Sequence, residues 1–228
     1  MDSDSARDAK IRLAVFETCR RDGSPPTAER LMGDLRLSRE AVESSLDRLD
    51  LAHHLKLVPG THRILMAFPF SAIATPFRVV LKDGRRYFAN CAWDAIAFHP
   101  MLDEPIRVES YCFECGGPIS FEIEDGRVTT RAENPPVVYL GLPAAEWWQD
   151  IISTCANTML FFSDAAHFRS WRRSHPEAQG ADLSVETVLK LSEPLYREKM
   201  ELGFARPSRD QLIQLFQDLG LRGEFWRI

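Results

Sequence analysis

The sequence predicts an α+β protein in which an N-terminal three-helix, winged-helix-like module packs on a mostly antiparallel sheet domain that ends in helices. Three observations predict this class. Apolar residues recur at helical spacing through residues 7–50, the periodicity changes to that of strands from residue 77, and helical patterns return from residue 144. We therefore expect a helical module over residues 1–70 and a mixed sheet and helix domain over residues 77–228.

The composition is that of an ordinary globular chain, with 228 residues, 45% hydrophobic and 27% charged. A net charge of −5 gives no reason to expect nucleic acid or an anionic membrane as a partner. No apolar run approaches the roughly 20 residues of a membrane helix, and the first residues lack the basic and apolar parts of a signal peptide. Five cysteines form an odd set that suits a reducing compartment, so the expected location is cytoplasmic.

The N-terminal module is expected to hold three short helices and a β-hairpin. Each helix has an apolar stripe, and Ser38 is placed to cap the third helix. Strand-like runs at 55–58 and 64–68, joined through a Pro59-Gly60 turn, complete the winged-helix-like pattern. The three stripes are Ile11, Ala14, Val15 and Cys19, then Ala28, Leu31, Met32 and Leu35, then Val42, Leu46 and Leu49.

A winged-helix pattern raises the possibility of DNA binding, and the charges of this module oppose it. Its first 60 residues hold ten Lys and Arg against eleven Asp and Glu, so there is no basic excess. The helix in the recognition position carries Arg39 and Arg48, but also three acidic residues that would repel phosphates, Glu40, Glu43 and Asp47. We predict that these helices do not bind DNA, and that they pack on the sheet domain and cover its functional site.

The middle of the chain is expected to form one mostly antiparallel sheet over residues 77–142. Strands at 77–82 and 85–88 flank Asp83-Gly84, a dipeptide typical of a primed hairpin turn. Further strands are expected at 106–111, 119–124, 128–130 and 137–142. Helices are expected at 144–152, 164–175, 184–202 and 208–220, with a buried strand or helix after Cys155.

Between the hairpin and the next strand, residues 90–100 are expected to form a short helix. Asn90 is a suitable N-cap, and Pro100 disfavours helical geometry in the residue before it, which sets the expected end. Cys91 then lies in the first turn, where free N–H groups and the helix dipole favour a thiolate. Asp94 shares its face. The pair is either a nucleophile beside a proton-carrying group or a core cysteine beside a carboxylate that favours the dipole.

Cys112 and Cys115 form a CxxC sequence followed by two glycines, which resembles one knuckle of a zinc site. Zinc would need two more ligands, and the sequence contains no second knuckle and no histidines at the paired spacing of zinc ligands. The two cysteines are therefore either half of a metal site or thiols in a turn.

The order of these features resembles that of the organomercurial (alkylmercury) lyases over roughly Ile11 to Met200. The strongest similarity is Cys91-Ala92-Trp93-Asp94, which looks like the Cys-x-x-Asp of that family. The other similar segments are Pro59-Gly60-Thr61-His62-Arg63, Ala67-Phe68-Pro69-Phe70-Ser71, Val108-Glu109-Ser110-Tyr111-Cys112 with Gly116, Pro118 and Ile119, and Cys155 ahead of Phe161-Phe162-Ser163 and Trp171.

The resemblance implies a mercury-resistance enzyme that cleaves carbon–mercury bonds by protonolysis, giving a hydrocarbon and Hg(II), without a cofactor. It implies that Cys91, Cys155 and Asp94 are catalytic and contact mercury as substrate and product, and that Cys112 is structural. The implied partners are a small organomercury compound, an external thiol for product release, and an Hg(II) acceptor such as a thiol or a mercuric reductase, with no nucleic acid and no membrane. The chain departs from the family at Cys115, at the residues after Cys155, and in roughly 25 additional C-terminal residues.

The chemistry of these residue types fits that implication. Soft thiolates are preferred ligands for soft metals, so two of them can hold an organomercury cation. Asp94 could accept a thiol proton and return it to carbon, a role favoured if burial raises its pKa. Cys91 and Cys155 must then lie close together, although they are 64 positions apart in the chain (155 − 91). An apolar pocket for the organic group is expected from Trp93, Trp147, Phe161 and Phe162.

Three alternatives remain open. A metal-sensing winged-helix regulator would bind DNA in a manner that changes with Hg(II) or Zn(II). A cysteine hydrolase would use Cys91 as nucleophile with His167 or His175 as base, although a carboxylate at i+3 opposes thiolate formation. A family scaffold with altered activity is the third.

Overall fold

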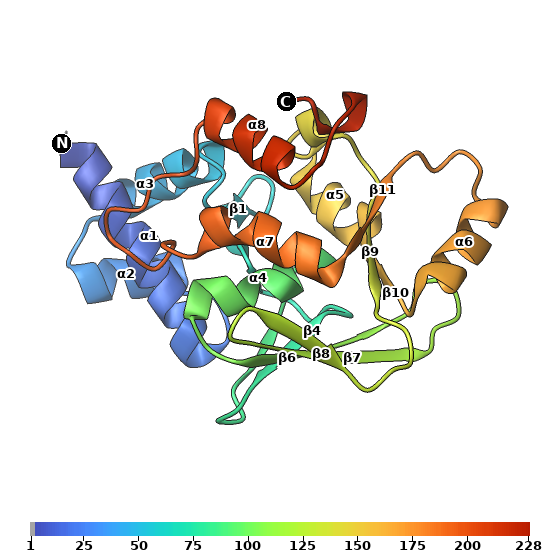
Figure 1. Cartoon of the computed structure of the whole chain (residues 1–228). Coiled ribbons are helices and arrows are strands. Elements are labelled where there is room, and N and C mark those ends of the chain that lie inside the picture. The colour runs from blue at the N-terminus through green and yellow to red at the C-terminus, as the bar shows by residue number, and fades with distance from the viewer. Residues whose placement is uncertain (1–2) are drawn as a thin grey trace.

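The computed structural model describes residues 3–228 and has the predicted α+β architecture (Figure 1). Its N-terminal part holds three helices followed by a small antiparallel sheet in the order β1-β2-β3. The bounds are α1 (Ser3–Asp22), α2 (Ala28–Leu35), α3 (Arg39–Leu51), β1 (Lys56–Leu57), β2 (Ile64–Ala67) and β3 (Phe70–Ser71). Among the described residues, no helix has both the length and the apolar character that crossing a membrane requires.

Side-chain caps set the starts of the second and third helices. The Thr27 hydroxyl accepts a hydrogen bond from the Arg30 amide, and the Ser38 hydroxyl accepts one from the Ala41 amide, each at 3.2 Å. The predicted cap at Ser38 is confirmed, as are the three helices and the hairpin that follows them. The winged-helix-like character of this module stays a prediction.

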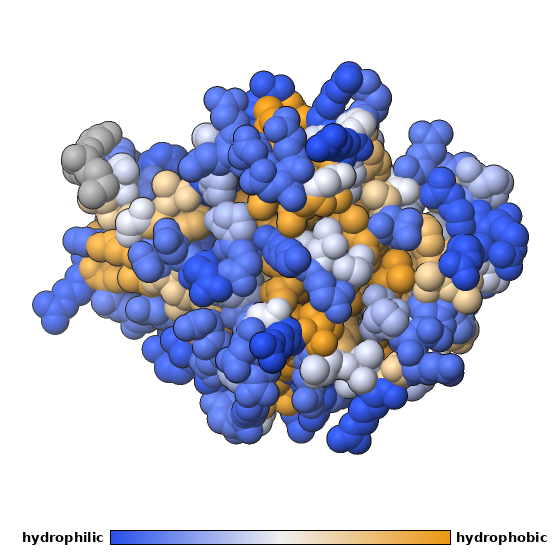
Figure 2. Space-filling model, viewed as in Figure 1, coloured by the Kyte–Doolittle hydropathy of each residue, from blue (hydrophilic) through white to orange (hydrophobic). Residues whose placement is uncertain are grey.

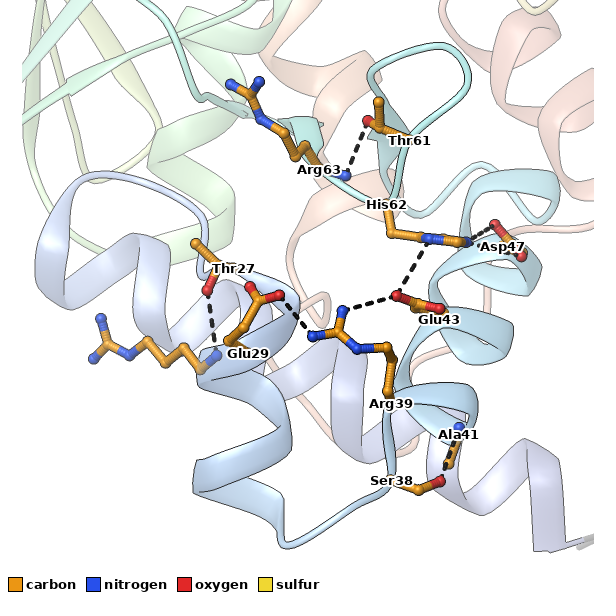
Figure 3. A network of polar contacts seen from close by, with 11 residues as sticks. Thr27, Glu29, Ser38, Arg39, Ala41, Glu43, Asp47, Thr61, His62 and Arg63 are labelled. Atoms are coloured by element: carbon orange, nitrogen blue, oxygen red, sulfur yellow. Dashed lines mark hydrogen bonds and ion pairs between the residues drawn. The ribbon is translucent and has the colours of Figure 1, made fainter.

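The charged residues of α3 are tied to one another and to their neighbours (Figure 3). Arg39 forms ion pairs with Glu29 and Glu43, each at 3.1 Å. His62, in the turn between β1 and β2, lies 3.6 Å from the Glu43 carboxylate and 3.3 Å from that of Asp47. The Arg39 guanidinium therefore already faces two carboxylates, which opposes its use on a phosphate backbone.

The central sheet has five antiparallel strands in the order β5-β4-β6-β7-β8. Its bounds are β4 (Arg78–Leu81), β5 (Arg86–Phe88), β6 (Ile106–Tyr111), β7 (Pro118–Glu124) and β8 (Arg127–Thr130). The predicted hairpin at Asp83-Gly84 is confirmed, with Gly84 at a φ of 89°. Strand β7 alternates between exposed and buried residues, so Ile119, Phe121 and Ile123 face the core.

Helix α4 (Ala92–Leu102) lies between this sheet and α7 (Val185–Tyr196), and all its residues are buried (Figure 1). The prediction that Pro100 ends the helix is wrong, because α4 continues to Leu102 and stops at Asp103, which has a φ of 52°. A proline lacks its own N–H and crowds the carbonyl of the residue four positions before it, and packing on both sides of α4 outweighs these costs. The ring of His99 also holds this turn, since it contacts the Glu104 carbonyl at 2.9 Å and accepts from the Gly126 amide at 3.2 Å.

A third sheet, in the order β10-β9-β11, corrects the prediction of one continuous sheet. Strand β9 (Val137–Leu140) was expected in the same sheet as the strands before it, but it pairs with β10 (Met159–Phe162) and β11 (Ala181–Ser184). Every residue of β10 is buried, so pairing with β10 places β9 in the core. The residues of β8 are exposed or half-buried, so pairing with β8 would not do so. Strand β11 was not predicted. Gly180 precedes it and is required there, because a Cβ would lie 2.2 Å from the Leu140 carbonyl oxygen.

The helices of the C-terminal half are shorter than predicted. The region 144–158 divides into a 3₁₀ turn, η1 (Ala144–Glu146), and α5 (Ile151–Thr158), whose start is capped by Asp150. It is followed by α6 (Ala165–Ser174), α7, α8 (Arg209–Asp218) and the 3₁₀ turn η2 (Glu224–Trp226). Trp226 is buried against Trp147 and Phe216, with ring centroids 6.3 and 5.4 Å away, so the end of the chain packs beside η1 and α8.

Candidate active site

Cys91 is the N-cap residue of α4, which corrects the prediction that Asn90 has this role. The Cys91 backbone is extended (φ −158°, ψ −179°), and its Sγ accepts a hydrogen bond from the Asp94 amide at 3.4 Å. The Asn90 amide is used elsewhere. It donates to the main-chain carbonyls of Pro69 and Phe70 and to Asp94 Oδ2, at 3.1, 3.3 and 3.0 Å. Asn90 thus joins the β3 region to the start of α4 and points Asp94 towards the sulfur.

The structure brings the three predicted site residues together. The Sγ atoms of Cys91 and Cys155 and a carboxylate oxygen of Asp94 lie within 4.8 Å of one another. Cys155 reaches this position from α5, and all three side chains are at most 3% exposed. Within residues 3–228, this is the one group of three His, Cys, Asp or Glu side chains with such spacing. Two soft sulfurs and one oxygen suit a soft metal such as mercury.

Both carboxylate oxygens of Asp94 accept hydrogen bonds. The Tyr196 hydroxyl donates to Oδ1 at 2.7 Å, and the Asn90 amide donates to Oδ2 at 3.0 Å. Burial raises the pKa of Asp94, while the hydrogen bonds from Tyr196 and Asn90 partly oppose that rise. Asp94 therefore binds a proton more readily than an ordinary aspartate does.

The two thiols are protonated in this environment. Burial raises the pKa of Cys91 well above its ordinary value, and the nearby Cys155 and Asp94 raise it further. The hydrogen bond from Cys91 lowers the pKa of Cys155, but burial and the Asp94 charge outweigh it, so this pKa is also raised. The expectation that the helix start makes Cys91 a thiolate is therefore wrong, because burial outweighs the dipole. A metal must displace these protons, and Asp94 lies within reach to accept one.

A cavity of about 410 Å³ opens above the three side chains. Trp93 and Trp147 line it, as predicted, together with other aromatic residues, Phe68, Trp148, Phe204 and Phe216. Phe161 and Phe162 were also expected there but lie in the core, because strand β10 directs them at Phe121 and Phe168, with ring centroids 5.6 and 5.3 Å away. An aromatic cavity of this volume suits a small organic group.

The wall of this cavity comes mainly from the C-terminal part of the chain. Leu195 and Tyr196 of α7, Arg209, Leu212 and Phe216 of α8, and the connecting residues Lys199, Phe204 and Arg206 all line it. Apolar residues reach the surface between α7 and α8 in the space-filling view (Figure 2). The N-terminal module contributes only His53, directly after α3, and Phe68, so the prediction that its helices cover the site is largely wrong.

Sequence reasoning did not identify Met159, Tyr196, Lys199 or Arg206 as parts of the site. The Met159 sulfur lies 3.6 Å from Cys91 Sγ, and the buried Lys199 donates to the Phe68 carbonyl at 2.8 Å. The available signal was weak. Tyr196 and Lys199 are three positions apart in the region expected to be helical, but nothing local places that region on α4.

The remaining candidates lie apart from this cluster. Cys112 is buried and accepts from the Ser163 amide at 3.3 Å, whereas Cys115 is exposed and accepts from the Gly117 amide at 3.4 Å. Among residues 3–228, no zinc-like ligand group forms around them. His167 contacts Asp164 at 3.1 Å and His175 contacts the Trp171 carbonyl at 2.9 Å, and neither lines the cavity. Neither histidine that the cysteine-hydrolase alternative would use as a base therefore lies beside Cys91.

Comparison with known proteins finds one family. The family model described as "MerB: Alkylmercury lyase" matches residues 70–197. The alkylmercury lyase of Staphylococcus epidermidis is 25% identical over 139 residues, which are 61% of this chain and 62% of that protein. The alkylmercury lyase of Bacillus cereus is 29% identical over 119 residues, 52% of each. The chain thus spans between half and two thirds of the length of these curated relatives.

A solved structure supports the same fold. "Crystal structure of the mercury-bound form of MerB2" aligns with a TM-score of 0.65 and 20% sequence identity, covering 88% of this chain and all of that one. The residues matched by the family model include Cys91, Asp94, Cys155 and Tyr196, and they end before Lys199 and Arg206.

Proposed function

Since this chain belongs to the alkylmercury lyase family, we propose that it cleaves the carbon–mercury bond of small organomercury compounds, releasing a hydrocarbon and Hg(II). The observation that supports this function is the cluster of two sulfurs and one carboxylate, within 4.8 Å of one another, beneath an aromatic cavity. The proposal assigns catalytic roles to Cys91, Cys155 and Asp94.

The first steps bind the substrate. One thiol, Cys91 or Cys155, displaces the ligand X of R–Hg–X, forming a sulfur–mercury bond while its proton leaves with X. The second thiol then binds the same mercury, and its proton passes to the Asp94 carboxylate, which both burial and position favour as acceptor. The mercury now carries two thiolates and the organic group, and electron donation from the sulfurs weakens the carbon–mercury bond.

The next step breaks that bond. Asp94 returns its proton to the carbon, the electron pair of the carbon–mercury bond becomes the new carbon–hydrogen bond, and R–H leaves. Hg(II) stays on the two thiolates, and Asp94 is again ionised. Two external thiols then exchange for Cys91 and Cys155, which regain their protons, and carry the Hg(II) to an acceptor such as a mercuric reductase.

Every proton and ligand in this sequence comes from a side chain, the substrate or an external thiol, so the proposal needs no cofactor. The five cysteines are unpaired, which suits a reducing compartment, and we propose a cytoplasmic location on that ground.

The test is release of benzene from phenylmercuric acetate in the presence of excess thiol. Asp94→Asn should still bind mercury but should cleave about 10²–10⁴-fold more slowly, because asparagine carries no transferable proton at neutral pH. Cys91→Ser with Cys155→Ser should lose both binding and cleavage, since hydroxyls are poor mercury ligands.

Cys115→Ser is the matched control, because it removes the exposed thiol and should leave benzene release unchanged. Absence of benzene from the parent protein would contradict the proposed function. Release by Asp94→Asn at the parent rate would remove Asp94 from the mechanism.

A further inference from the structure

Within residues 3–228, three Lys and Arg side chains line the cavity and have no part in the proposed chemistry. Arg209 is exposed and donates to the Ile228 main-chain oxygen at 2.8 Å, whereas the other two, Lys199 and Arg206, are more deeply placed. Lys199 is 5% exposed, and its ammonium lies 4.5 Å from the centre of the Tyr196 ring. Arg206 is partly buried, donates to the His53 carbonyl at 2.6 Å, and lies over the Trp148 ring at 4.5 Å. Both follow α7 and belong to the wall that the C-terminal part of the chain builds.

Neither side chain has a carboxylate partner among residues 3–228, where Lys199 donates to one main-chain carbonyl and Arg206 to another. Asp94 is the one acidic residue in the cavity lining, and its oxygens are taken by Tyr196 and Asn90. Arg12, buried behind Lys199, also donates only to main-chain carbonyls. A guanidinium that is removed from water without a counter-ion is costly, so the partly buried Arg206 favours the binding of an anion at this wall.

The neighbouring histidine is consistent with this excess of positive charge. Burial, followed by the charges of Lys199, Arg12 and Arg206, lowers the pKa of His54 to about 3. Burial and Arg206 likewise lower the pKa of Lys199 well below its ordinary value, although the Asp94 charge partly opposes them, so Arg206 supplies the permanent charge of this wall. An anion placed between the two side chains would favour protonated Lys199.

An ordinary organomercury substrate does not supply this anion, because its R–Hg group replaces a thiol proton that leaves with X and the charge of the site stays the same. An organic group that carries a carboxylate would instead offset the positive charge of the wall. A guanidinium on an aromatic face is suited to a carboxylate, since it offers paired N–H donors in one plane. The cavity of about 410 Å³ also has room for a substituted aromatic ring above the sulfurs.

We propose that Arg206 and Lys199 form an anion subsite, and that this protein acts preferentially on arylmercury compounds whose ring carries a carboxylate. The inference rests on the proposed function for its chemistry, and on the cavity wall for its selectivity. The mercury binds at Cys91 and Cys155, the ring fills the aromatic cavity, and the carboxylate meets Arg206.

The kinetic test compares 4-carboxyphenylmercury with phenylmercury, measuring benzoate and benzene release under excess thiol. The parent protein should show a kcat/KM about tenfold or more higher for the carboxylated compound, mainly through KM. Arg206→Gln should remove most of this preference, and Arg206→Lys should retain part of it because the charge remains. Arg131→Gln, at an exposed arginine outside the cavity, is the matched control and should keep the parent ratio.

A binding test without mercury separates this inference from the proposed function. Benzoate and its neutral analogue benzamide are titrated calorimetrically into the parent and Arg206→Gln. The parent should bind benzoate about tenfold more tightly than benzamide, and the variant should not. If benzoate is preferred but no organomercurial is cleaved, the subsite stands and the proposed function fails.

Two results would overturn the subsite. One is equal binding of benzoate and benzamide by the parent. The other is an equal loss of kcat/KM for both organomercurials in Arg206→Gln, which would mean that the guanidinium aids cleavage in general and does not recognise a carboxylate.

Discussion

At the scale of single residues, burial controls how each reactive group holds its proton. Cys91 lies at a helix start that favours a thiolate, yet its burial keeps the thiol protonated. Asp94 is buried as well, but Tyr196 and Asn90 provide hydrogen bonds that favour its ionised form. The resting site thus combines protonated thiols with a carboxylate that can accept a proton, which is the distribution that the proposed mechanism needs.

Tyr196→Phe tests whether this hydrogen bond sets the behaviour of Asp94. Loss of the donor should raise the pKa of Asp94 further, because the hydrogen bond from Tyr196 favours the ionised carboxylate. Since Asp94 must be ionised to accept the thiol proton, the rate falls as pH decreases through its pKa. The acid limb of the single-turnover rate should therefore move to higher pH in the variant. Tyr111→Phe, at an exposed tyrosine, should leave the profile in place, and an unshifted limb in Tyr196→Phe would contradict this role.

The sequence alone could identify only part of this site. Cys91 and Asp94 are three positions apart on one helix, so local spacing was sufficient to pair them. Cys155 was assigned through a family resemblance, because no local pattern joins it to Cys91. Lys199 and Arg206 reach the cavity from a segment without regular structure, and their positions depend on how α7 packs on α4. The protonation states of Cys91, Cys155 and Asp94 could not be predicted from the sequence either, because they depend on how deeply each side chain is buried.

At the scale of elements, a two-point ion pair joins α1 to α3. Arg48 donates to both carboxylate oxygens of Asp8 at 2.7 Å and to the Ser45 hydroxyl at 3.0 Å. Burial raises the pKa of Asp8, but the hydrogen bonds from Arg48 and Ser45 outweigh it, and the net pKa lies below 3.8. The ionised carboxylate therefore stabilises the folded state.

Asp8→Asn should lower the free energy of unfolding by about 0.5–1 kcal/mol at pH 7, as expected for a partly exposed pair. Because the folded-state pKa is lowered, this contribution is present above pH 3.8 and is lost as pH falls through the folded-state value. Denaturant unfolding of both proteins should therefore converge in acid. Glu133→Gln, in an exposed loop, is the control, and a pH-independent difference would mean that packing is responsible.

Local sequence signals predicted the positions of turns, caps and strands better than they predicted which strands pair with one another. The Asp83-Gly84 hairpin and the caps at Ser38 and Asp150 involve residues within a few positions, and the structure contains all of them, although the cap at Asp150 was not predicted. Strand β9 does not belong to the expected sheet. It pairs with β10, whose residues are all buried, and this pairing depends on tertiary packing. Pro100 was misread for a related reason, since packing on both sides of α4 outweighs the local preference of His99.

At the scale of the whole molecule, the charge distribution opposes binding to nucleic acid. The net charge is −5, and Arg39 on α3 is paired with two carboxylates. We predict no salt-dependent binding of random duplex DNA at micromolar protein, measured by fluorescence anisotropy. Binding that weakens with added salt would contradict this prediction and would favour the metal-sensing regulator.

The separation of the two sulfurs along the chain has a consequence for folding. Cys91 and Cys155 meet only after α4 and α5 have docked, across 64 positions, whereas Cys112 and Cys115 are near neighbours even in an unfolded chain. Closing the longer loop costs roughly 2–3 kcal/mol more in chain entropy. Loop entropy therefore favours capture of Hg(II) by the adjacent pair over the distant pair in a chain that has not yet folded. The proposed function accordingly requires that α4 and α5 dock before mercury reaches the chain.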